Sequence, residues 1–312
     1  MRCAARLCVL IEENRMEAAN KIAIITDTCC DLPQEYLKEY PIFCVPLVVT
    51  SGTESYRDNI DITVETIYAR QKNENFKTSL PRPQDIEDVY SAIARQGYTH
   101  VIVLMIAECL SSANNLMRLA AEEHPELTVK VFDSKSASIG LGALAVQVAR
   151  YAVRGVAFDP LCELTKRLID DTVVYFSLDT LEYLRRGGRI SGAAALVGGM
   201  LSIKPVVGVV DGDVVVLGKA RGSKQSKNMV FQKIDEAGGI DFTRPIWVAY
   251  SGLSDTTARK YIADSLAQAK AAEEAAADES AVPDDLPLTQ VGAVIGTHVG
   301  PGGVAFAFFA RE

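Results

Sequence analysis

Short apolar runs alternate with amphipathic segments along the first half of the chain. The runs predict strands at residues 22–26, 43–50, 101–106 and 129–132, because unbroken apolar stretches of this length are typical of buried strands. Apolar positions that recur every three or four residues predict helices at residues 33–39, 63–71, 83–95, 113–123 and 139–153. Strands that alternate with helices in this way indicate a parallel sheet.

The second half of the chain has a different pattern, and Gly155 marks the crossing between the two halves. Residues 206–210 and 214–217 predict a hairpin, because an Asp-Gly turn at Asp211 and Gly212 joins two β-branched runs. The other expected elements are helices at 160–169, after Ser223 and from Ser254, and strands at 173–177, 246–251, 292–295 and 304–309. We therefore expect two domains, at residues 21–155 and 156–312.

Two segments stand apart from this pattern. Residues 267–287 are rich in alanine and acidic residues, which predicts a helix that frays into a mobile linker or insertion. Residues 1–20 form a leader with a basic start and a short apolar run, but Glu12, Glu13 and Asn14 follow where a cleavage site would need small residues. The leader is a poor signal peptide, and Met16 is an alternative start.

Composition narrows the class of protein. The chain has 312 residues, of which 48% are apolar, so it can bury a sizeable core. Its net charge of −8 argues against nucleic acid as a partner, because the phosphates would be repelled. The one basic run, at residues 219–227, is interpreted as the solvated start of a helix. No apolar run approaches the roughly 20 residues of a membrane span, so stable membrane insertion is not expected.

The cysteine pattern predicts neither a metal site nor a disulfide framework. There are seven cysteines, an odd number, and none has the paired spacing of metal ligands. Cys29 and Cys30 are adjacent, which is a poor arrangement for binding one metal together. We therefore expect a protein of a reducing cytoplasm with no metal and no cofactor.

Four short segments carry candidate chemistry. Arg189 follows two glycines at the end of a short helix, and a guanidinium in such a bend suits a carboxylate or phosphate. His298 opens the glycine-rich bend HVGPGG. Thr78 and Ser79 lie just before a predicted helix, and Ser111 lies at the start of another. Hydroxyls at helix starts are most often caps, although helix starts also attract anions.

Taken in order, these segments resemble the DegV family of bacterial fatty-acid-binding proteins. The resemblance runs from Lys21 to Phe309. It rests on ITDTCCDLP, TSLP, CLSSA, FDSKSASIGLG, LRRGGRIS with the IKP that follows, KARGSKQS and HVGPGG. The resemblance implies a DegV-like two-domain α/β fold, with an N-terminal three-layer α/β/α domain around a parallel sheet. It also implies a C-terminal α/β domain with a mixed, largely antiparallel sheet.

The resemblance also implies a site. In such proteins a fatty-acid carboxylate is held by the residues that correspond to Thr78, Ser111, Arg189 and His298, and Ser79 is their neighbour. The sequence departs from the family pattern at Leu80, Ser112 and Ala113, and at Glu108, whose carboxylate would repel a bound acid unless it turns away or pairs with a base. A long apolar slot is needed for the tail, and its expected walls are residues 193–201, 206–210 and 304–309.

The family role that follows is that of a carrier without a catalytic motif of its own. It would hold a long-chain fatty acid and present it to a separate fatty acid kinase, which forms an acyl phosphate for phospholipid synthesis. The sequence contains no phosphate loop, no G-x-S-x-G elbow, no H-E-x-x-H and no dinucleotide fingerprint. Two alternatives stay open: an acyl hydrolase that uses Ser111 and His298 with Asp133, and a lipid-sensing regulatory protein without a kinase.

Overall fold

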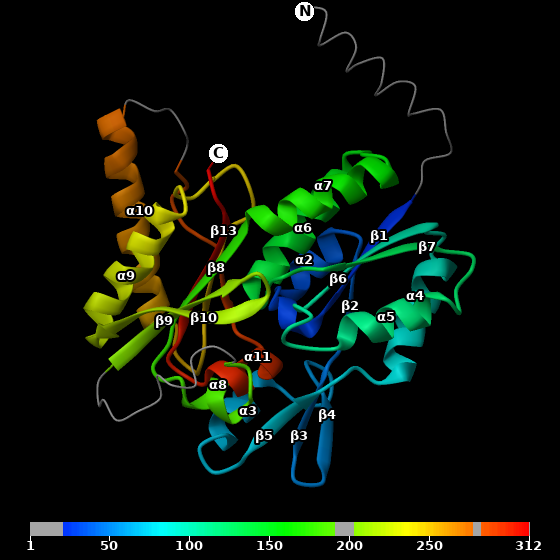
Figure 1. The fold of residues 1–312 in the computed structure, drawn as a ribbon, viewed down its shortest axis with the longest axis horizontal. Helices are drawn as coiled ribbons and strands as arrows, with labels where there is room; N and C mark the ends of the chain where they lie inside the picture. Colours follow the sequence, from blue (N-terminus) through cyan, green and yellow to red (C-terminus); the bar gives the residue numbers. More distant parts are fainter. Residues whose placement is uncertain (1–20, 191–202, 277–281, 312) are drawn as a thin grey trace, which may run out of the picture.

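Three sheets organise the protein. The computed structural model describes residues 21–190, 203–276 and 282–311, and Figure 1 shows their arrangement. A four-stranded and a three-stranded sheet come from the first half of the chain, and a six-stranded sheet comes from the second. The predicted leader and the whole of the cavity wall predicted at 193–201 lie outside the described residues.

The four-stranded sheet is parallel throughout and has the order β2-β1-β6-β7. Its strands are β1 (Ile22–Asp27), β2 (Ile42–Val45), β6 (His100–Met105) and β7 (Thr128–Asp133). All six residues of β1 are buried, because helices cover both faces of the sheet. These helices include α2 (Gln34–Glu39), α4 (Pro83–Arg95), α5 (Ala113–Ala121) and α6 (Ile139–Val153). The prediction of a covered parallel sheet is confirmed.

The three-stranded sheet was not predicted. The single strand expected at residues 43–50 is two strands in two sheets, β2 and β3 (Val48–Ser51), which are separated by Pro46 and Leu47. Pro46 has no N–H group to donate to a strand ladder, so the pairing ends there. In this sheet β3 lies between β4 (Glu54–Arg57) and β5 (Phe76–Ser79), and α3 (Val64–Arg70) connects the last two.

The six-stranded sheet has the order β10-β9-β8-β13-β11-β12 and is antiparallel except for its last pair. Its strands are β8 (Thr172–Ser177), β9 (Ile203–Val210), β10 (Asp213–Arg221), β11 (Trp247–Tyr250), β12 (Leu288–Gln290) and β13 (Val304–Phe309). The predicted hairpin is confirmed, since β9 and β10 are joined at Asp211 and Gly212, both with positive φ. The mixed, largely antiparallel sheet is confirmed as well.

Helices from both halves cover the two faces of this sheet. Figure 1 shows α9 (Gly222–Glu236) and α10 (Thr256–Ala276) on one side, and α6 with α7 (Phe158–Asp171) on the side toward the parallel sheet. The helical part of the segment predicted at 267–287 is present as far as Ala276, and residues 277–281 lie outside the described chain. Beyond them Leu286 is buried, so the chain packs back onto the core there.

The strand expected at residues 292–295 is wrong. These residues begin helix α11 (Ala293–Val299), and the strand beside β11 is the earlier β12. Six of the seven residues of α11 are buried, and the four residues expected as a strand, 292–295, carry no polar side chain. A short, uniformly apolar run has no periodicity that separates a buried helix from a buried strand, and the surroundings decide between them.

Helix α6 connects the two halves of the molecule. It packs against β1 of the parallel sheet and against β8 and β13 of the mixed sheet, and one apolar cluster spans both halves. Close approach requires glycine: a Cβ at Gly142 would lie 2.5 Å from the carbonyl oxygen of Cys30, and one at Gly140 would lie 3.0 Å from Val174. The division proposed at residue 155 falls between α6 and α7 and stays a prediction, because the core is shared across it.

Candidate functional site

A cavity of about 470 Å³ opens where the two halves meet. One of its walls is the carboxyl edge of the parallel sheet, formed by Cys29 after β1, Ile106 after β6 and Ala137 after β7. Strands β1 and β6 are neighbours from which the chain runs in opposite directions along the sheet. Crevices at such a switch point are the usual ligand sites of parallel sheets.

The opposite wall is apolar and comes from the mixed sheet and α11. Phe176, Val207, Val209 and Val214 line the cavity from β8, β9 and β10. Helix α11 adds Val294, Ile295 and Val299. The wall expected at 206–210 is therefore present in part. The wall expected at 304–309 is wrong, because β13 is a central strand whose six residues are buried in the core and do not line the cavity.

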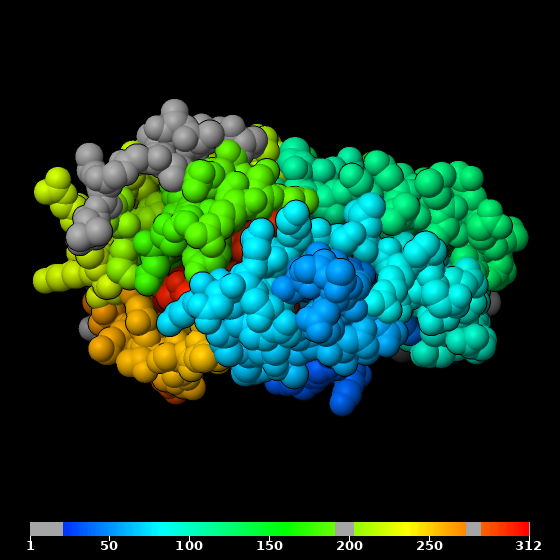
Figure 2. All heavy atoms as spheres, turned by 90° about the horizontal axis from the view of Figure 1, so that it is seen from below, coloured from blue at the N-terminus to red at the C-terminus, as the bar shows by residue number. Residues whose placement is uncertain are grey.

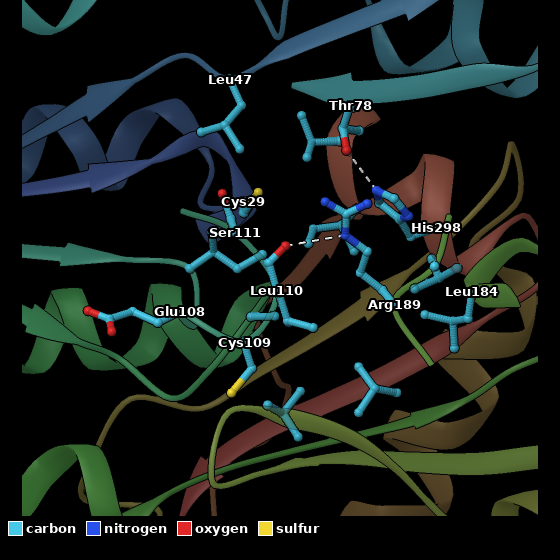
Figure 3. Close-up of a pocket in the computed structure, with 18 of the residues that line it drawn as sticks. Cys29, Leu47, Thr78, Glu108, Cys109, Leu110, Ser111, Leu184, Arg189 and His298 are labelled. Carbon is cyan, nitrogen blue, oxygen red and sulfur yellow. Dashed lines mark hydrogen bonds between the residues drawn. The ribbon is translucent and has the colours of Figure 1, made fainter. Parts of the chain in front are cut away.

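All of the sequence-predicted site residues lie around this one cavity. Figure 2 shows a furrow between the light-blue β3–β5 region and the green α8 region, with red atoms of the α11 region at its base. Figure 3 shows the cavity lining at close range. The predicted residues that line it are Thr78, Ser79, Ser111, Arg189 and His298.

Arg189 is held by the backbone on both sides of the cavity. It follows α8 (Glu182–Arg186), where Gly188 takes the left-handed turn that the sequence predicts, whereas Gly187 keeps helical angles. Its Nε donates to the carbonyl oxygen of Leu110 at 3.2 Å, and its Nη1 donates to that of Gly187 at 2.7 Å. No carboxylate among the described residues pairs with it. The guanidinium is thus oriented but its charge is left for another anion.

His298 lies beside Arg189 in the last turn of α11, not in the bend that the sequence predicts. Its Nε2 is 2.8 Å from Oγ1 of Thr78, as the dashed line in Figure 3 marks. Burial, and to a lesser extent the Arg189 charge, lowers the pKa of His298 to about 4. The imidazole is therefore neutral at pH 7.

The packing around His298 indicates which ring nitrogen carries the proton. Nδ1 is buried and has no hydrogen-bond partner among the described residues. It faces Gly187 so closely that a Cβ there would lie 2.0 Å from it. Because an N–H at Nδ1 would be a donor without an acceptor, we assign the proton to Nε2, which donates to Thr78. The hydroxyl hydrogen of Thr78 is then free to donate to a ligand.

Thr78 and Ser79 reach the cavity from β5, so neither is a helix cap. Thr78 is paired with Val49 of β3, and helix α4 begins only at Pro83. Ser111 is not the helix cap either, because it precedes the N-cap residue of α5, Ser112; its Oγ accepts a hydrogen bond of 3.3 Å from the backbone N–H of Ala113, the first residue of the helix. The hydroxyl hydrogen of Ser111 stays available, because this contact uses only the oxygen.

Glu108 lines the cavity but does not face the polar cluster. Its carboxylate pairs with the guanidinium of Arg118 on α5. In Figure 3 it points away from Arg189 and His298. The sequence predicts that the Glu108 carboxylate repels a bound acid unless it turns away or pairs with a base. In the structure it does both, so this repulsion is weakened.

The hydrolase triad is not assembled in this structure. His298 bonds to Thr78, and Ser111 bonds to the start of α5. Oδ1 of Asp133 accepts hydrogen bonds of 3.0 Å from the backbone N–H groups of Glu108 and Lys135. A nucleophile needs hydrogen-bond contact with its base, and here the base is engaged elsewhere.

Among the described residues no group of three or more His, Cys, Asp or Glu side chains is placed to hold a metal ion. No helix there is both long and apolar enough to cross a bilayer.

Two contacts that shape the site were not predicted. The carbonyl of Leu110, which orients Arg189, has no sequence signal, because every residue carries the same backbone group. Gly187 had a signal in the adjacent glycines, but its role is to make room for His298 and not to turn the chain.

Comparison with known proteins agrees with the fold. The family model described as DegV, uncharacterised protein, matches residues 21–311. A DegV domain-containing protein of Clostridium perfringens is 33% identical over 285 residues, which cover 90% of this chain and 96% of the relative. The solved structure of a fatty-acid-binding DegV family protein from Thermus thermophilus has a TM-score of 0.78 at 30% identity and covers 93% of this chain and all of that one. A stearic-acid-binding protein from Eubacterium ventriosum has a TM-score of 0.79 at 27% identity, over 92% of this chain and 97% of that one.

Replacement of Gly187 by alanine tests the assignment of His298. We expect Gly187→Ala to displace the imidazole and to raise the pKa of His298 from about 4 toward its ordinary value of 6.5, because the ring loses its buried position. Titration of the histidine resonances by NMR measures this. Gly188→Ala is the control, since nothing lies near its Cβ and only backbone strain of about 1 kcal/mol is added. An unchanged His298 titration in Gly187→Ala would contradict the geometry.

The stability of the protein should depend on pH through His298. Its folded-state pKa is lowered, so the unfolded chain binds the proton more tightly, and the stabilisation is present above pH 6.5 and lost as the pH falls toward 4. We expect the unfolding free energy to fall by up to about 3 kcal/mol over this window. Denaturant unfolding of the protein and of His298→Gln isolates the contribution, because the buried Asp27, Asp31 and Asp58, whose pKa values are raised, act in the opposite direction in both. If the unfolding free energy changed with pH equally in the two proteins, the result would be inconsistent with a neutral His298.

Proposed function

This chain belongs to the DegV family, and from that premise we propose that it binds a long-chain fatty acid in the cavity between its two halves. The observation that carries the proposal is one apolar cavity with a polar cluster on its lining. The cluster offers the guanidinium of Arg189 and the hydroxyls of Thr78 and Ser111. The Thermus thermophilus and Eubacterium ventriosum neighbours, which are described as binding a fatty acid and stearic acid, support the same ligand class.

The charge arrangement suits a carboxylate. A carboxylate that leaves water needs donors and an opposite charge. Arg189 has no acidic partner among the described residues, and the neutral His298 leaves the hydroxyl hydrogen of Thr78 free to point at the ligand. Ser111 supplies a second hydroxyl. In this proposal His298 does not contact the ligand itself but orients the hydroxyl of Thr78. Ser79 lies at the rim of the cavity, where its side chain is exposed.

The tail supplies most of the binding free energy. Each buried methylene contributes about 0.8 kcal/mol, so a chain of about 14 methylenes gives on the order of 10 kcal/mol before the costs of association. The apolar side chains from β8, β9, β10 and α11 offer the surface for it. Retention therefore depends chiefly on the walls of the cavity, and the polar cluster selects for an acid and fixes its orientation.

We further propose that the protein presents its bound acid to a separate fatty acid kinase, which supplies ATP and metal and forms the acyl phosphate. The carrier then contributes position: Arg189 and Thr78 hold the carboxylate so that one oxygen is available for in-line attack on the γ-phosphate. The absence of an assembled Ser111, His298 and Asp133 triad supports a carrier over an acyl hydrolase.

Native mass spectrometry of the purified protein, followed by lipid extraction, tests the first proposal. We expect each protein molecule to carry one long-chain fatty acid in the cavity. Protein that carries no acid and does not take up palmitate or oleate added in solution would overturn it. Hydrolysis of an acyl ester that is lost in Ser111→Ala would favour the hydrolase instead. Retained lipid without a kinase that accepts the loaded protein would favour a lipid-sensing role.

Replacement of Arg189 separates retention from presentation. We expect Arg189→Ala to retain most of the co-purifying acid, because the tail dominates the affinity, but to lower acyl-phosphate formation by a fatty acid kinase by about tenfold or more. The two quantities are measured by lipid extraction and by trapping the acyl phosphate with hydroxylamine. Arg185→Ala, an exposed arginine of α8, is the control. Equal loss of retention and of phosphorylation would refute this division of roles.

Replacement of Ala137 tests the apolar wall. Ala137 is buried and lines the cavity, so Ala137→Leu should fill part of it and shift the preferred acid by roughly two to four carbons toward shorter chains. Competition between acids of different length, analysed by native mass spectrometry, measures the shift. Ala263→Leu on the exposed face of α10 is the control. An unchanged length profile in Ala137→Leu would place the tail elsewhere.

A further inference from the structure

Asp31 is a buried carboxyl group just outside the cavity. It follows the 3₁₀ helix η1 (Thr28–Cys30) and is only 6% exposed. Its backbone is left-handed, with φ of 51°, which is uncommon for a residue other than glycine. The conformation turns the side chain and the carbonyl of Asp31 toward two distant parts of the chain.

Three hydrogen bonds connect Asp31 to these parts. Oδ1 accepts from the backbone N–H of Gly292 at 2.8 Å, across 261 residues of sequence. Oδ2 accepts from the hydroxyl of Ser138, across 107 residues. The backbone carbonyl of Asp31 accepts from Oγ1 of Thr289 at 3.1 Å. Asp31 therefore holds together η1, the start of α6 and the segment that leads into α11.

In each of these three segments, a residue that lines the cavity lies within two positions of Asp31 or of the residue bonded to it. Cys29 precedes Asp31 by two positions, and Ala137 precedes Ser138 by one. Val294 follows Gly292 by two positions. The same helix α11 then carries His298 to the polar cluster. A displacement of any one of these bonds must therefore move a wall of the cavity.

The surroundings of Asp31 show that the junction is tight. Ser138 has φ of 54° and ψ of −144°, a strained backbone that its hydrogen bond to Asp31 stabilises. A Cβ at Gly292 would lie 2.8 Å from Oδ1 of Asp31, so only glycine allows this approach. Tyr68 closes the other side, since its hydroxyl donates to the carbonyl of Val291.

We propose that Asp31 is a positioning residue for the cavity: it fixes η1, α6 and α11 relative to one another, and thereby sets the separation of the walls and the place of His298. The part that concerns ligand release rests on the proposed function, whereas the part that concerns His298 does not. Asp31 touches neither the ligand nor the polar cluster and acts only through these segments.

Asparagine is the matched conservative variant. It tolerates the left-handed backbone, keeps an acceptor toward Gly292 and offers a donor to the oxygen of Ser138. Burial raises the pKa of Asp31 to about 8, so the neutral amide changes the charge at this position little at pH 7. Glycine is the disruptive variant, because it fits the backbone without strain and removes both side-chain hydrogen bonds.

The experiment compares Asp31→Asn, Asp31→Gly and the unmodified protein by two measurements. The first is the NMR titration of His298 in protein stripped of lipid, and the second is the rate at which labelled palmitate leaves the loaded protein. In Asp31→Gly we expect the pKa of His298 to rise from about 4 toward 6.5 and palmitate release to be about tenfold faster. In Asp31→Asn we expect both to stay close to the native values.

Ile93→Val is the control for stability alone, because Ile93 is buried in the separate apolar cluster between α4 and the parallel sheet. It should lower the unfolding free energy and leave His298 and release unchanged. The proposal is overturned if Asp31→Gly leaves His298 at its native titration, or if Asp31→Asn is as defective as Asp31→Gly.

Gly292→Ala keeps the proposal testable if Asp31→Gly does not fold. Its Cβ would push against Oδ1 of Asp31, and we expect the same change in His298 and in release. A native titration of His298 in Gly292→Ala would overturn the proposal. Failure of the unmodified protein to hold palmitate would refute the fatty-acid function, and the His298 titration would still decide the role of Asp31.

Discussion

The cavity between the two halves is organised around Arg189, whose positive charge has no acidic partner among the residues that the structure describes. Arg189 is held by two backbone carbonyls, from Leu110 and Gly187, and these orient the guanidinium without neutralising it. His298 beside it is neutral because burial and the same charge lower its pKa. A fixed cation beside neutral donors and apolar walls is an arrangement that suits a single anionic group on an apolar molecule.

The fold supplies this arrangement by opposing two sheets. The parallel sheet ends in the loops that carry Cys29, Ile106 and Ala137, and the mixed sheet presents β8, β9 and β10 toward them. Helix α6 packs against both sheets and so fixes their separation. Because each half contributes one wall and part of the polar cluster, the site exists only in the complete molecule.

Three departures from the DegV pattern, Leu80, Glu108 and Ser112, lie at the exposed edge of the cavity, and the fourth, Ala113, is buried in the core at the start of α5. Glu108 pairs with Arg118 and turns away, and Leu80 is partly exposed at the edge of the cavity. Charges at such exposed positions are screened by water, so their effect on a bound carboxylate is small compared with that of Arg189. These substitutions therefore leave the polar cluster in place.

The sequence by itself determined the parallel and mixed sheets and the β9–β10 hairpin, and it picked out five residues that line one cavity, because strand periodicity, turn chemistry and motif residues are local properties of the chain. The sequence-based prediction was wrong where the surroundings of a segment decide whether it forms a helix or a strand. The apolar run at 292–295 was expected to be a strand, although it leads into helix α11, and β2 and β3 were expected to be one strand. Only the tertiary structure decided that Thr78 meets His298 across 220 residues, that Glu108 turns to Arg118, and that Asp31 joins three walls. Contacts between distant segments depend on packing in three dimensions, which no local pattern encodes.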